Sequence, residues 1–165
     1  MTDSVRQLTR IGMASALCVA GTLILIPGPN GALIHLGSGA LYLVAVIYGR
    51  RVGAWAGAIG SLVFDLIVGL SAYSLWSFVI KGIAGWLVGR FAHGGVQTPS
   101  RGVILGATML ASLWTLIGYI GAWRFVIGSW AAAIANIPFS LMTSAVGIVV
   151  AVLAAPVLSR IVRKV

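Results

Sequence analysis

The stretch that decides the fold is GRRVGAWAGAIGSLVFDLIVGLSAYSLWSFVIKGIAGWLVG, residues 49–89. It consists of two glycine-rich apolar segments in succession. Each segment contains one ionisable side chain, Asp65 in the first and Lys81 in the second. A charge inside hydrocarbon is energetically costly, so an intramembrane ionisable residue is a functional-site hypothesis by default. The structural alternative is a buried ion pair that only holds two helices together.

The composition places the chain in a membrane. Of its 165 residues 60% are hydrophobic and only 8% are charged, and the mean hydropathy is +1.09. Soluble domains carry about 25% charged residues, which predicts an integral membrane protein here. The net charge of +9 invites a nucleic-acid partner, but the basic residues stand at the ends of apolar runs, where they encode membrane topology. We therefore expect no nucleic-acid partner.

Six apolar runs approach or exceed the length of about 20 residues that a helix needs to cross a bilayer. We predict an all-α integral membrane protein, a single domain of six transmembrane helices in a compact bundle over residues 1–165. Prolines and glycines break the chain between Pro27 and Gly31. Pro138 interrupts the last run, which could begin as a short re-entrant or surface segment or be kinked. The predicted helices are residues 11–27, 34–48, 52–70, 75–91, 102–122 and 125–158.

The basic residues orient the bundle. With six helices, nine of them fall on one side of the membrane and only Arg124 falls on the other. This asymmetry predicts that both termini lie in the cytoplasm of a multi-pass protein of a prokaryotic plasma membrane. The nine are Arg6, Arg10, Arg50, Arg51, Arg90, Arg101, Arg160, Arg163 and Lys164.

The two intramembrane charges are predicted to lie at the same depth. Asp65 lies six residues before Ser71, and Lys81 lies seven residues after Ser74. At 1.5 Å per residue, both lie roughly 10 Å below the outer surface. The two groups could therefore meet each other, or both could face one cavity that opens to the outside. Small residues at helical spacing would bring these two helices close together. They are Gly53, Gly57 and Gly60 in one helix and Gly82, Gly85 and Gly89 in the next.

Aromatic and polar side chains gather at the same outer level. Stacking surfaces with a few polar groups are what a site for a small, flat, polar molecule needs. Aromatic residues also form ordinary interfacial belts, which is the alternative for Trp123 and Trp130. The predicted substrate-binding residues are Asn30, His35, Asp65, Tyr73, Trp76, Lys81, Tyr119, Arg124, Trp130 and Asn136.

The chain lacks the sequence signatures of common ATP-hydrolysing proteins and enzymes. It has no phosphate-binding loop of the G-x-x-x-x-G-K-[ST] type, no G-x-S-x-G elbow and no H-E-x-x-H pair. The two histidines, His35 and His93, fall on opposite sides of the predicted membrane, and Cys18 is the only cysteine. We therefore expect no catalytic residues, no metal site and no cofactor.

The central part of the chain resembles a known protein family. The block IHLGSGALYLVAVIYGRRVGAWAGAIGSLVFDLIVG, followed by LWSFVIKGIAGWLVG, resembles the substrate-binding S component of energy-coupling factor (ECF) vitamin transporters. The resemblance implies that the protein binds a small water-soluble vitamin or precursor from outside. It also implies a membrane-embedded coupling subunit and two cytoplasmic ATPases as partners, and toppling of the S component during delivery. The matching residues are Gly53, Gly57, Gly60, Ser61, Asp65, Gly69, Lys81, Gly82 and Gly85.

Some positions depart from the family pattern. Ser38 stands where an acid is common, and Ser77 or Phe78 stands where threonine is common. Ser140 and Thr143 stand where asparagine and glutamine are common. The resemblance implies that these positions line the ligand site. Within the family, the expected substrates are pyridoxine-like or hydroxymethylpyrimidine-like compounds, and folate is the next candidate.

The first helix carries a small-residue strip. Ala16 and Ala20 match an A-x-x-x-A pattern that Gly12 extends. The resemblance implies that this strip docks on the coupling subunit, and ordinary helix packing is the alternative. Two other functions stay open at this point. One is a self-sufficient secondary carrier that uses Asp65 and Lys81, although no inverted repeat is detectable. The other is a non-transporting membrane scaffold.

Overall fold

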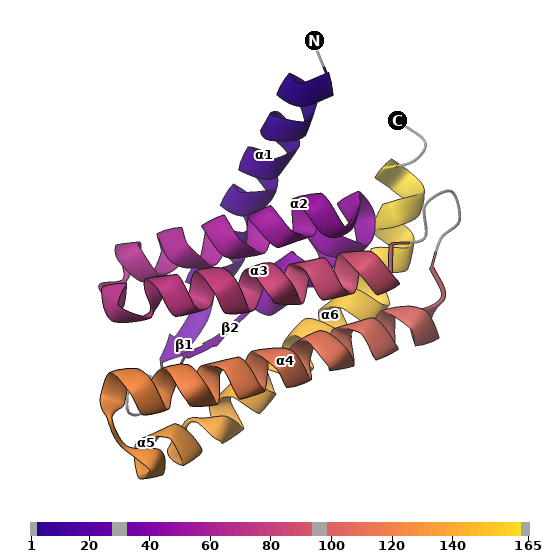
Figure 1. Ribbon diagram of the computed structural model, residues 1–165. Coiled ribbons are helices and arrows are strands. Elements are labelled where there is room, and N and C mark those ends of the chain that lie inside the picture. Colours follow the sequence, from indigo (N-terminus) through magenta and orange to yellow (C-terminus); the bar gives the residue numbers. More distant parts are fainter. Residues whose placement is uncertain (1–2, 28–32, 94–98, 163–165) are drawn as a thin grey trace.

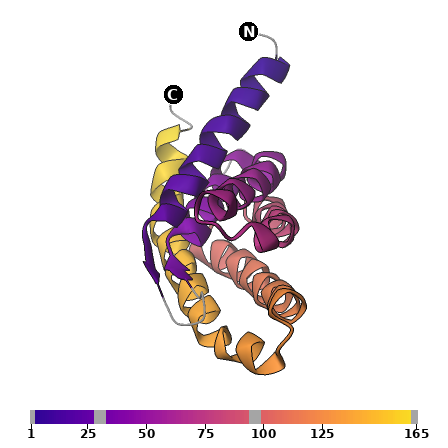
Figure 2. The same cartoon turned by 90° about the vertical axis from the view of Figure 1, so that its left-hand side faces the viewer.

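The computed structural model describes residues 3–27, 33–93 and 99–162 (Figure 1). Almost all of these residues are helical, as the all-α prediction requires, and one short β-hairpin is added. The start of α1 and the end of α6 lie on the same side of the bundle (Figures 1 and 2). The elements are α1 (Asp3–Leu23), β1 (Leu25–Pro27), β2 (Leu33–His35), α2 (Gly37–Ile67), η2 (Ser71–Tyr73), α3 (Ser74–Phe91), α4 (Arg101–Ile127), α5 (Trp130–Ala135) and α6 (Ile137–Val162).

Helix α2 is a hairpin of two helical arms that reverses direction at Gly49. Its backbone has φ 81° and ψ −175°, a conformation that is essentially restricted to glycine. The arms, residues 37–48 and 50–67, then pack against each other. A Cβ placed on Gly53 would lie 2.7 Å from the Cβ of Ala45, which shows how closely the arms approach. The sequence predicted separate helices over 34–48 and 52–70, and the break between them lies at this glycine.

Glycines bring α3 against the second arm of α2. A Cβ on Gly85 would collide with the carbonyl oxygen of Gly53, and one on Gly57 would collide with the carbonyl oxygen of Lys81. Such contact between backbones is typical of small residues in membrane helices. Gly60 instead packs against α1, because a Cβ on Gly60 would lie 2.8 Å from the Cβ of Cys18. The predicted glycine rows therefore pack against two different helices.

The connection between α1 and α2 differs from the sequence prediction. The helix expected over 11–27 ends at Leu23, and the helix expected from residue 34 begins at Gly37. The chain between them forms antiparallel strands in which Leu25 pairs with His35 and Pro27 with Leu33. Apolar periodicity cannot separate a short strand from the end of an apolar helix, and this is the reason for the error.

The C-terminal part also differs in where its helices begin and end. Helix α4 continues to Ile127 and ends at Gly128, which has φ 76° and acts as a left-handed cap. Trp123 and Arg124 therefore lie inside a helix and do not form the expected connection. The run expected over 125–158 is divided into α5 and α6 at Asn136. Pro138 lies in the first turn of α6, where its missing N–H leaves no backbone hydrogen bond unmade.

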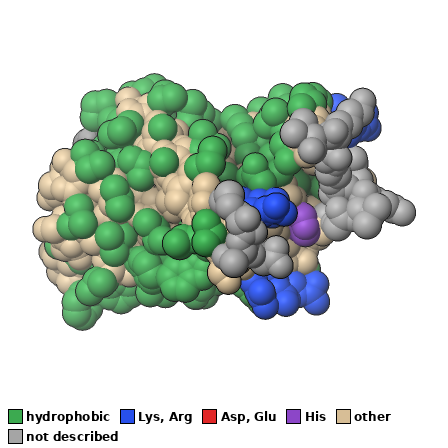
Figure 3. Space-filling view, turned by 90° about the horizontal axis from the view of Figure 1, so that it is seen from above, with side chains coloured by type: hydrophobic (Ala, Val, Ile, Leu, Met, Phe, Trp, Pro, Cys, Tyr) green, Lys and Arg blue, Asp and Glu red, His purple; other side chains and the backbone are tan. Residues whose placement is uncertain are grey.

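The surface is that of a membrane protein. Three helical stretches within the described residues are long and apolar enough to cross a bilayer: Ser71–Phe91, Arg101–Ile127 and Trp130–Val162. Large apolar side chains such as Leu75, at 76% exposure, point outward, whereas many buried positions carry alanine. Seen from above, hydrophobic side chains cover much of the surface, and the visible lysine and arginine side chains gather towards one end (Figure 3). Such extended exposed apolar area indicates contact with lipid.

Candidate functional site

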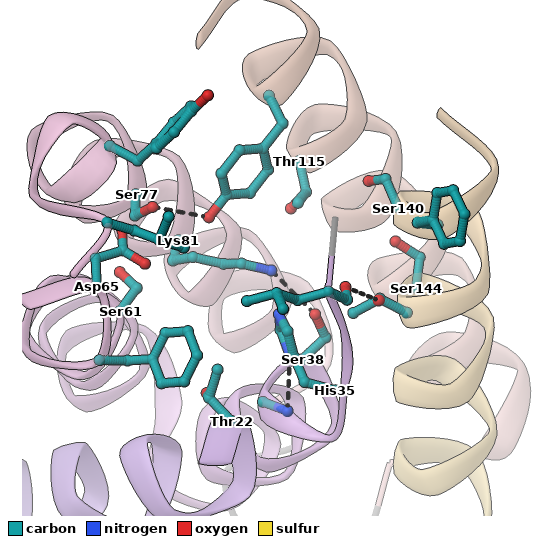
Figure 4. A pocket seen from close by; sticks show the side chains of 18 of the residues that line it. Thr22, His35, Ser38, Ser61, Asp65, Ser77, Lys81, Thr115, Ser140 and Ser144 are labelled. Atoms are coloured by element: carbon teal, nitrogen blue, oxygen red, sulfur yellow. Dashed lines mark hydrogen bonds between the residues drawn. The ribbon is translucent and has the colours of Figure 1, made fainter. Parts of the chain in front are cut away.

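A cavity of about 430 Å³ lies inside the helix bundle (Figure 4). Its wall combines side chains from α1, the β-hairpin, both arms of α2, α3, α4, α5 and α6. This volume lies within the usual range for small-molecule sites. The lining residues are Cys18, Thr22, Leu33, His35, Gly37, Ser38, Leu41, Gly57, Ser61, Phe64, Asp65, Leu70, Tyr73, Ser77, Lys81, Thr115, Tyr119, Trp123, Ile127, Ala132, Phe139, Ser140, Thr143 and Ser144.

Lys81 projects from α3 into this cavity (Figure 4). The side chain is only 7% exposed. Its Nζ donates a hydrogen bond to Oγ of Ser38 over 3.0 Å and lies 5.7 Å from the centre of the Tyr119 ring. An ammonium group has three donors, so further donor capacity exists beyond the bond to Ser38. Lys81 is therefore held in place by the protein and still equipped to bind an acceptor.

Asp65 lies in the second arm of α2 and lines the same cavity. Its side chain is 6% exposed, and its buried Oδ2 atom has no hydrogen-bond partner. The structure describes both Asp65 and Lys81. No contact of 4.0 Å or less joins the carboxylate of Asp65 to the ammonium group of Lys81. A buried polar atom without a partner is costly and calls for an explanation. The sequence left open whether the two charges meet each other, and the geometry shows that they do not.

Aromatic rings and hydroxyl groups complete the wall. Tyr119 stacks on Trp123 with ring centres 5.7 Å apart, and its hydroxyl lies 3.0 Å from Oγ of Ser77. Phe64 lies 6.1 Å from the ring of His35. Flat surfaces beside hydroxyl groups suit a ligand with an aromatic ring and polar substituents.

His35 connects the β-hairpin to the cavity. Its Nδ1 accepts a hydrogen bond from the backbone N–H of Gly37 over 3.1 Å. Burial of the ring, and then the positive charge of Lys81, lower the pKa of His35 from its ordinary value of 6.5 to about 3. The ring is therefore neutral at pH 7, which is the form that can accept this bond. Among the described residues, His35 belongs to no group of three or more metal-ligating side chains.

Five of the predicted substrate-binding residues line the cavity: His35, Asp65, Tyr73, Lys81 and Tyr119. Four others lie elsewhere, and Asn30 lies outside the described residues. Trp76 packs against Phe125 with ring centres 5.6 Å apart. The guanidinium carbon of Arg124 lies 5.5 Å from the ring centre of Trp130, which is 59% exposed. Asn136 is buried where α5 meets α6, and its Oδ1 atom has no partner.

The predicted substrate-binding residues were grouped by their depth along the helix axes, which does not fix the direction of a side chain. Residues four apart share one face of a helix. Accordingly Thr115, Tyr119 and Trp123 of α4 all line the cavity, whereas Arg124 is turned away from it. The sequence prediction used the level of each residue and not its direction around the helix.

Hydroxyl residues are the group that the sequence prediction missed. Thr22, Thr115 and Ser144 line the cavity and were not singled out, and Ser61, which also lines it, was named only for its match to the family pattern. Serine and threonine in helices often bond only to their own backbone, as Ser61 does to the carbonyl oxygen of Gly57 over 2.8 Å. The presence of serine and threonine in the sequence therefore does not indicate which of them line a cavity. For Thr115, the spacing of four residues to Tyr119 on α4 does indicate it.

The positions that depart from the family pattern fall on the cavity wall. Ser38, Ser77, Ser140 and Thr143 all line it. Thr143 also donates a hydrogen bond to the carbonyl oxygen of Leu33 over 3.1 Å, which ties α6 to the hairpin. Ser77, and not Phe78, is the residue that faces the cavity.

Helix α1 presents two different faces. Gly12, Ala16 and Ala20 lie on the exposed side. No atom outside the helix lies within 4 Å of a Cβ built on Gly12. The other side carries Cys18 and Thr22, which are buried and line the cavity. The small-residue strip is therefore exposed on the surface of the described part of this chain.

These features define a class, the helical membrane proteins that hold a partly polar cavity for a small molecule. The chain belongs to the family described as "ECF-type riboflavin transporter, S component", whose model matches residues 2–160. The resemblance stated from the sequence is thereby confirmed, and the family is one of transporter components.

Two relatives cover most of the chain. A protein of Pyrococcus woesei named "Uncharacterized protein in gap 3'region" is 32% identical over 136 residues, 82% of this chain and 88% of its own. The "Thiamine precursor transporter HmpT" of Lactococcus lactis subsp. cremoris (strain MG1363) is 27% identical over 164 residues, 95% of this chain and 90% of its own. A "UPF0397 protein" of Streptococcus agalactiae is 34% identical over 93 residues, which are 55% of this chain and 50% of its own.

Proposed function

We propose that the protein captures a water-soluble vitamin or vitamin precursor in the cavity and passes it to a separate energising module for uptake. The observation that carries this proposal is the arrangement of Asp65 and Lys81. Both are buried on one cavity wall and no ion pair joins them. A cavity that offers an unpaired acceptor and a donor with spare capacity is suited to an external polar molecule.

The substrate class follows from the chemistry of the wall. The carboxylate of Asp65 can accept a hydrogen bond from an amino or hydroxyl substituent, and Lys81 can donate one to a ring nitrogen or oxygen. Tyr119, Trp123 and Phe64 supply surfaces for a flat ring. Hydroxymethylpyrimidine-like or pyridoxine-like compounds remain our first choice, and folate follows. The name of the Lactococcus relative supports a thiamine precursor, and the family description adds riboflavin to the candidates.

The proposal includes six crossing segments and cytoplasmic termini. The two arms of α2 count as separate segments. The first arm is about 18 Å long at 1.5 Å per residue, which makes it the shortest of the six proposed segments. The basic residues support this orientation, because Arg6 and Arg10 of α1 share a surface hollow with Arg51 at the α2 turn. Arg124 lies near the other end of α4 from Arg101.

The proposed partners are a membrane-embedded coupling subunit and two cytoplasmic ATPases. The support is the exposed strip of Gly12, Ala16 and Ala20 on α1. Small side chains allow a partner helix to approach closely. The cavity wall from α1 lies directly behind this strip, so docking and substrate binding would share one helix.

A binding screen tests the proposal. Purified protein in detergent is titrated by calorimetry with hydroxymethylpyrimidine, pyridoxine, folate, riboflavin and thiamine. We expect sub-micromolar affinity for one of them, and no binding across the panel would overturn the proposal. Uptake is then measured in proteoliposomes. The protein alone should accumulate no vitamin under a proton gradient, and uptake without ATPases would indicate a secondary carrier instead.

A further inference from the structure

A second hollow lies on the surface, away from the vitamin cavity. It measures about 360 Å³ and shares no lining residue with that cavity. One side comes from the N-terminal turns of α1, which project beyond the other helices (Figures 1 and 2). The other side comes from residues around the Gly49 turn of α2. The lining residues are Arg6, Gln7, Arg10, Tyr48, Arg51 and Val52.

The charged residues that line this hollow are all positive. Three arginines line it, and the chain contains only two acids, Asp3 and Asp65. Asp65 lies in the cavity inside the bundle, and no acid lines this hollow among the described residues. Arg6 and Arg10 are four residues apart on one helix face, where like charges destabilise the helix. An anion from outside the chain would relieve this repulsion.

The side chains specify what kind of anion fits. All three cations are arginines, whose planar guanidinium groups bind phosphate oxygens through paired hydrogen bonds. Arg10 directly precedes the apolar run that begins at Ile11, which places the hollow at the level of lipid headgroups. Tyr48 is 40% exposed, and Trp55, one helical turn after Arg51, is 49% exposed. Exposed aromatic rings at such a position are typical of the membrane interface.

We propose that this hollow binds the phosphate of an anionic phospholipid headgroup. The phosphate connects the N-terminal turns of α1 to the α2 turn and neutralises the three arginines. A basic pocket between helices at the cytoplasmic surface is a recognised form of lipid site. A lipid is favoured over an acidic protein segment because exposed aromatic side chains stand at the hollow, namely Tyr48 in its lining and Trp55 one helical turn after Arg51. The proposal does not depend on which vitamin is bound.

The test uses the full chain in detergent and measures bound lipid by native mass spectrometry and stability by thermal unfolding. The probes are phosphatidylglycerol, phosphatidylcholine and inorganic phosphate. The variant Arg6→Gln/Arg10→Gln/Arg51→Gln is compared with Arg90→Gln/Arg101→Gln/Arg160→Gln. The control triple removes the same charge and leaves the hollow intact. We expect phosphatidylglycerol, and not phosphatidylcholine, to bind and stabilise the wild type. We also expect affinity to fall about tenfold or more in the first triple only.

Other outcomes would overturn the proposal. Equal losses in both triples would indicate a general charge effect, and equal stabilisation by inorganic phosphate would indicate a free-anion site. If the glutamine triple does not fold, Arg6→Lys/Arg10→Lys/Arg51→Lys keeps the charge and removes the paired hydrogen bonds. We expect this variant to bind phosphatidylglycerol more weakly than the wild type does, and wild-type affinity in it would count against the arginine site.

Discussion

The ammonium group of Lys81 donates its hydrogen bond to Ser38, 43 positions away in the chain, and not to the carboxylate of Asp65. Ser38 stands on the first arm of α2, directly after the β-hairpin, and Lys81 stands in the middle of α3. The bond therefore joins two elements that both line the cavity. It leaves the two intramembrane charges free to serve a ligand.

The first prediction concerns Lys81→Met. We expect vitamin affinity to fall by roughly 10- to 100-fold, since a hydrogen bond to a charged group contributes about 1.5 to 3 kcal/mol. Titration calorimetry measures the change. Ser38→Ala should weaken binding less, because the charge remains. Arg124→Gln is the matched control, since it removes a positive charge outside the cavity. An equal loss in this control would mean that general electrostatics, and not contact with Lys81, is responsible.

The second prediction concerns the pair of charges. The double variant Asp65→Asn/Lys81→Met should be no more stable than the less stable of the two single variants, because no ion pair within 4.0 Å joins the two groups. The double variant should also fail to bind the vitamin. The measurements are melting temperatures and dissociation constants for the wild type, both single variants and the double variant. A double variant that is more stable than either single variant, with binding restored, would show a structural ion pair.

The third prediction concerns the turn of α2. Gly49→Ala should destabilise the protein by about 1 to 3 kcal/mol, because a side chain strains this backbone conformation. The added Cβ would also lie 3.1 Å from the ring of His93. Thermal unfolding in detergent measures the effect. Gly106→Ala is the control, since a Cβ there meets no atom within 4 Å and the helix gains a better helix former. Equal melting temperatures for the two variants would contradict the assigned turn.

The fourth prediction concerns pH. The pKa of His35 is about 3 in the folded protein and 6.5 ordinarily, so the unfolded chain binds more protons between these values. Stability is therefore fully present above about pH 6.5 and is lost as the pH falls towards 3. We expect a lower melting temperature at pH 5.0 than at pH 7.5. His35→Gln should reduce this difference, and an unchanged difference would rule out His35 as its source.

The fifth prediction concerns the α1 strip. Ala16→Leu/Ala20→Leu should leave vitamin affinity within about twofold of the wild type, because both residues face away from the cavity. Co-purification with the coupling subunit and ATP-dependent uptake should both fall, since bulky side chains prevent close helix contact. Ala145→Leu, at an exposed position of α6, is the control for added bulk. Normal uptake by the double variant would place the docking surface elsewhere.

Several features could be derived from the sequence alone because they depend only on composition and on position along the chain. Composition is sufficient to place the chain in a membrane, and turn-forming residues mark the break at Gly49. Rise per residue places Asp65 and Lys81 at one depth, and both do line one cavity. The order of motifs identifies the family without any coordinates.

The tertiary structure decides what depends on direction around a helix axis and on pairing between distant segments. It directs Tyr119 into the cavity and Arg124 away from it. It forms the β-hairpin that carries His35, and it pairs Lys81 with Ser38 instead of Asp65. Apolar residues surround most of each membrane helix, so the sequence pattern carries little information about which face is buried. Helix packing through the glycines, which brings backbones into contact, supplies that direction.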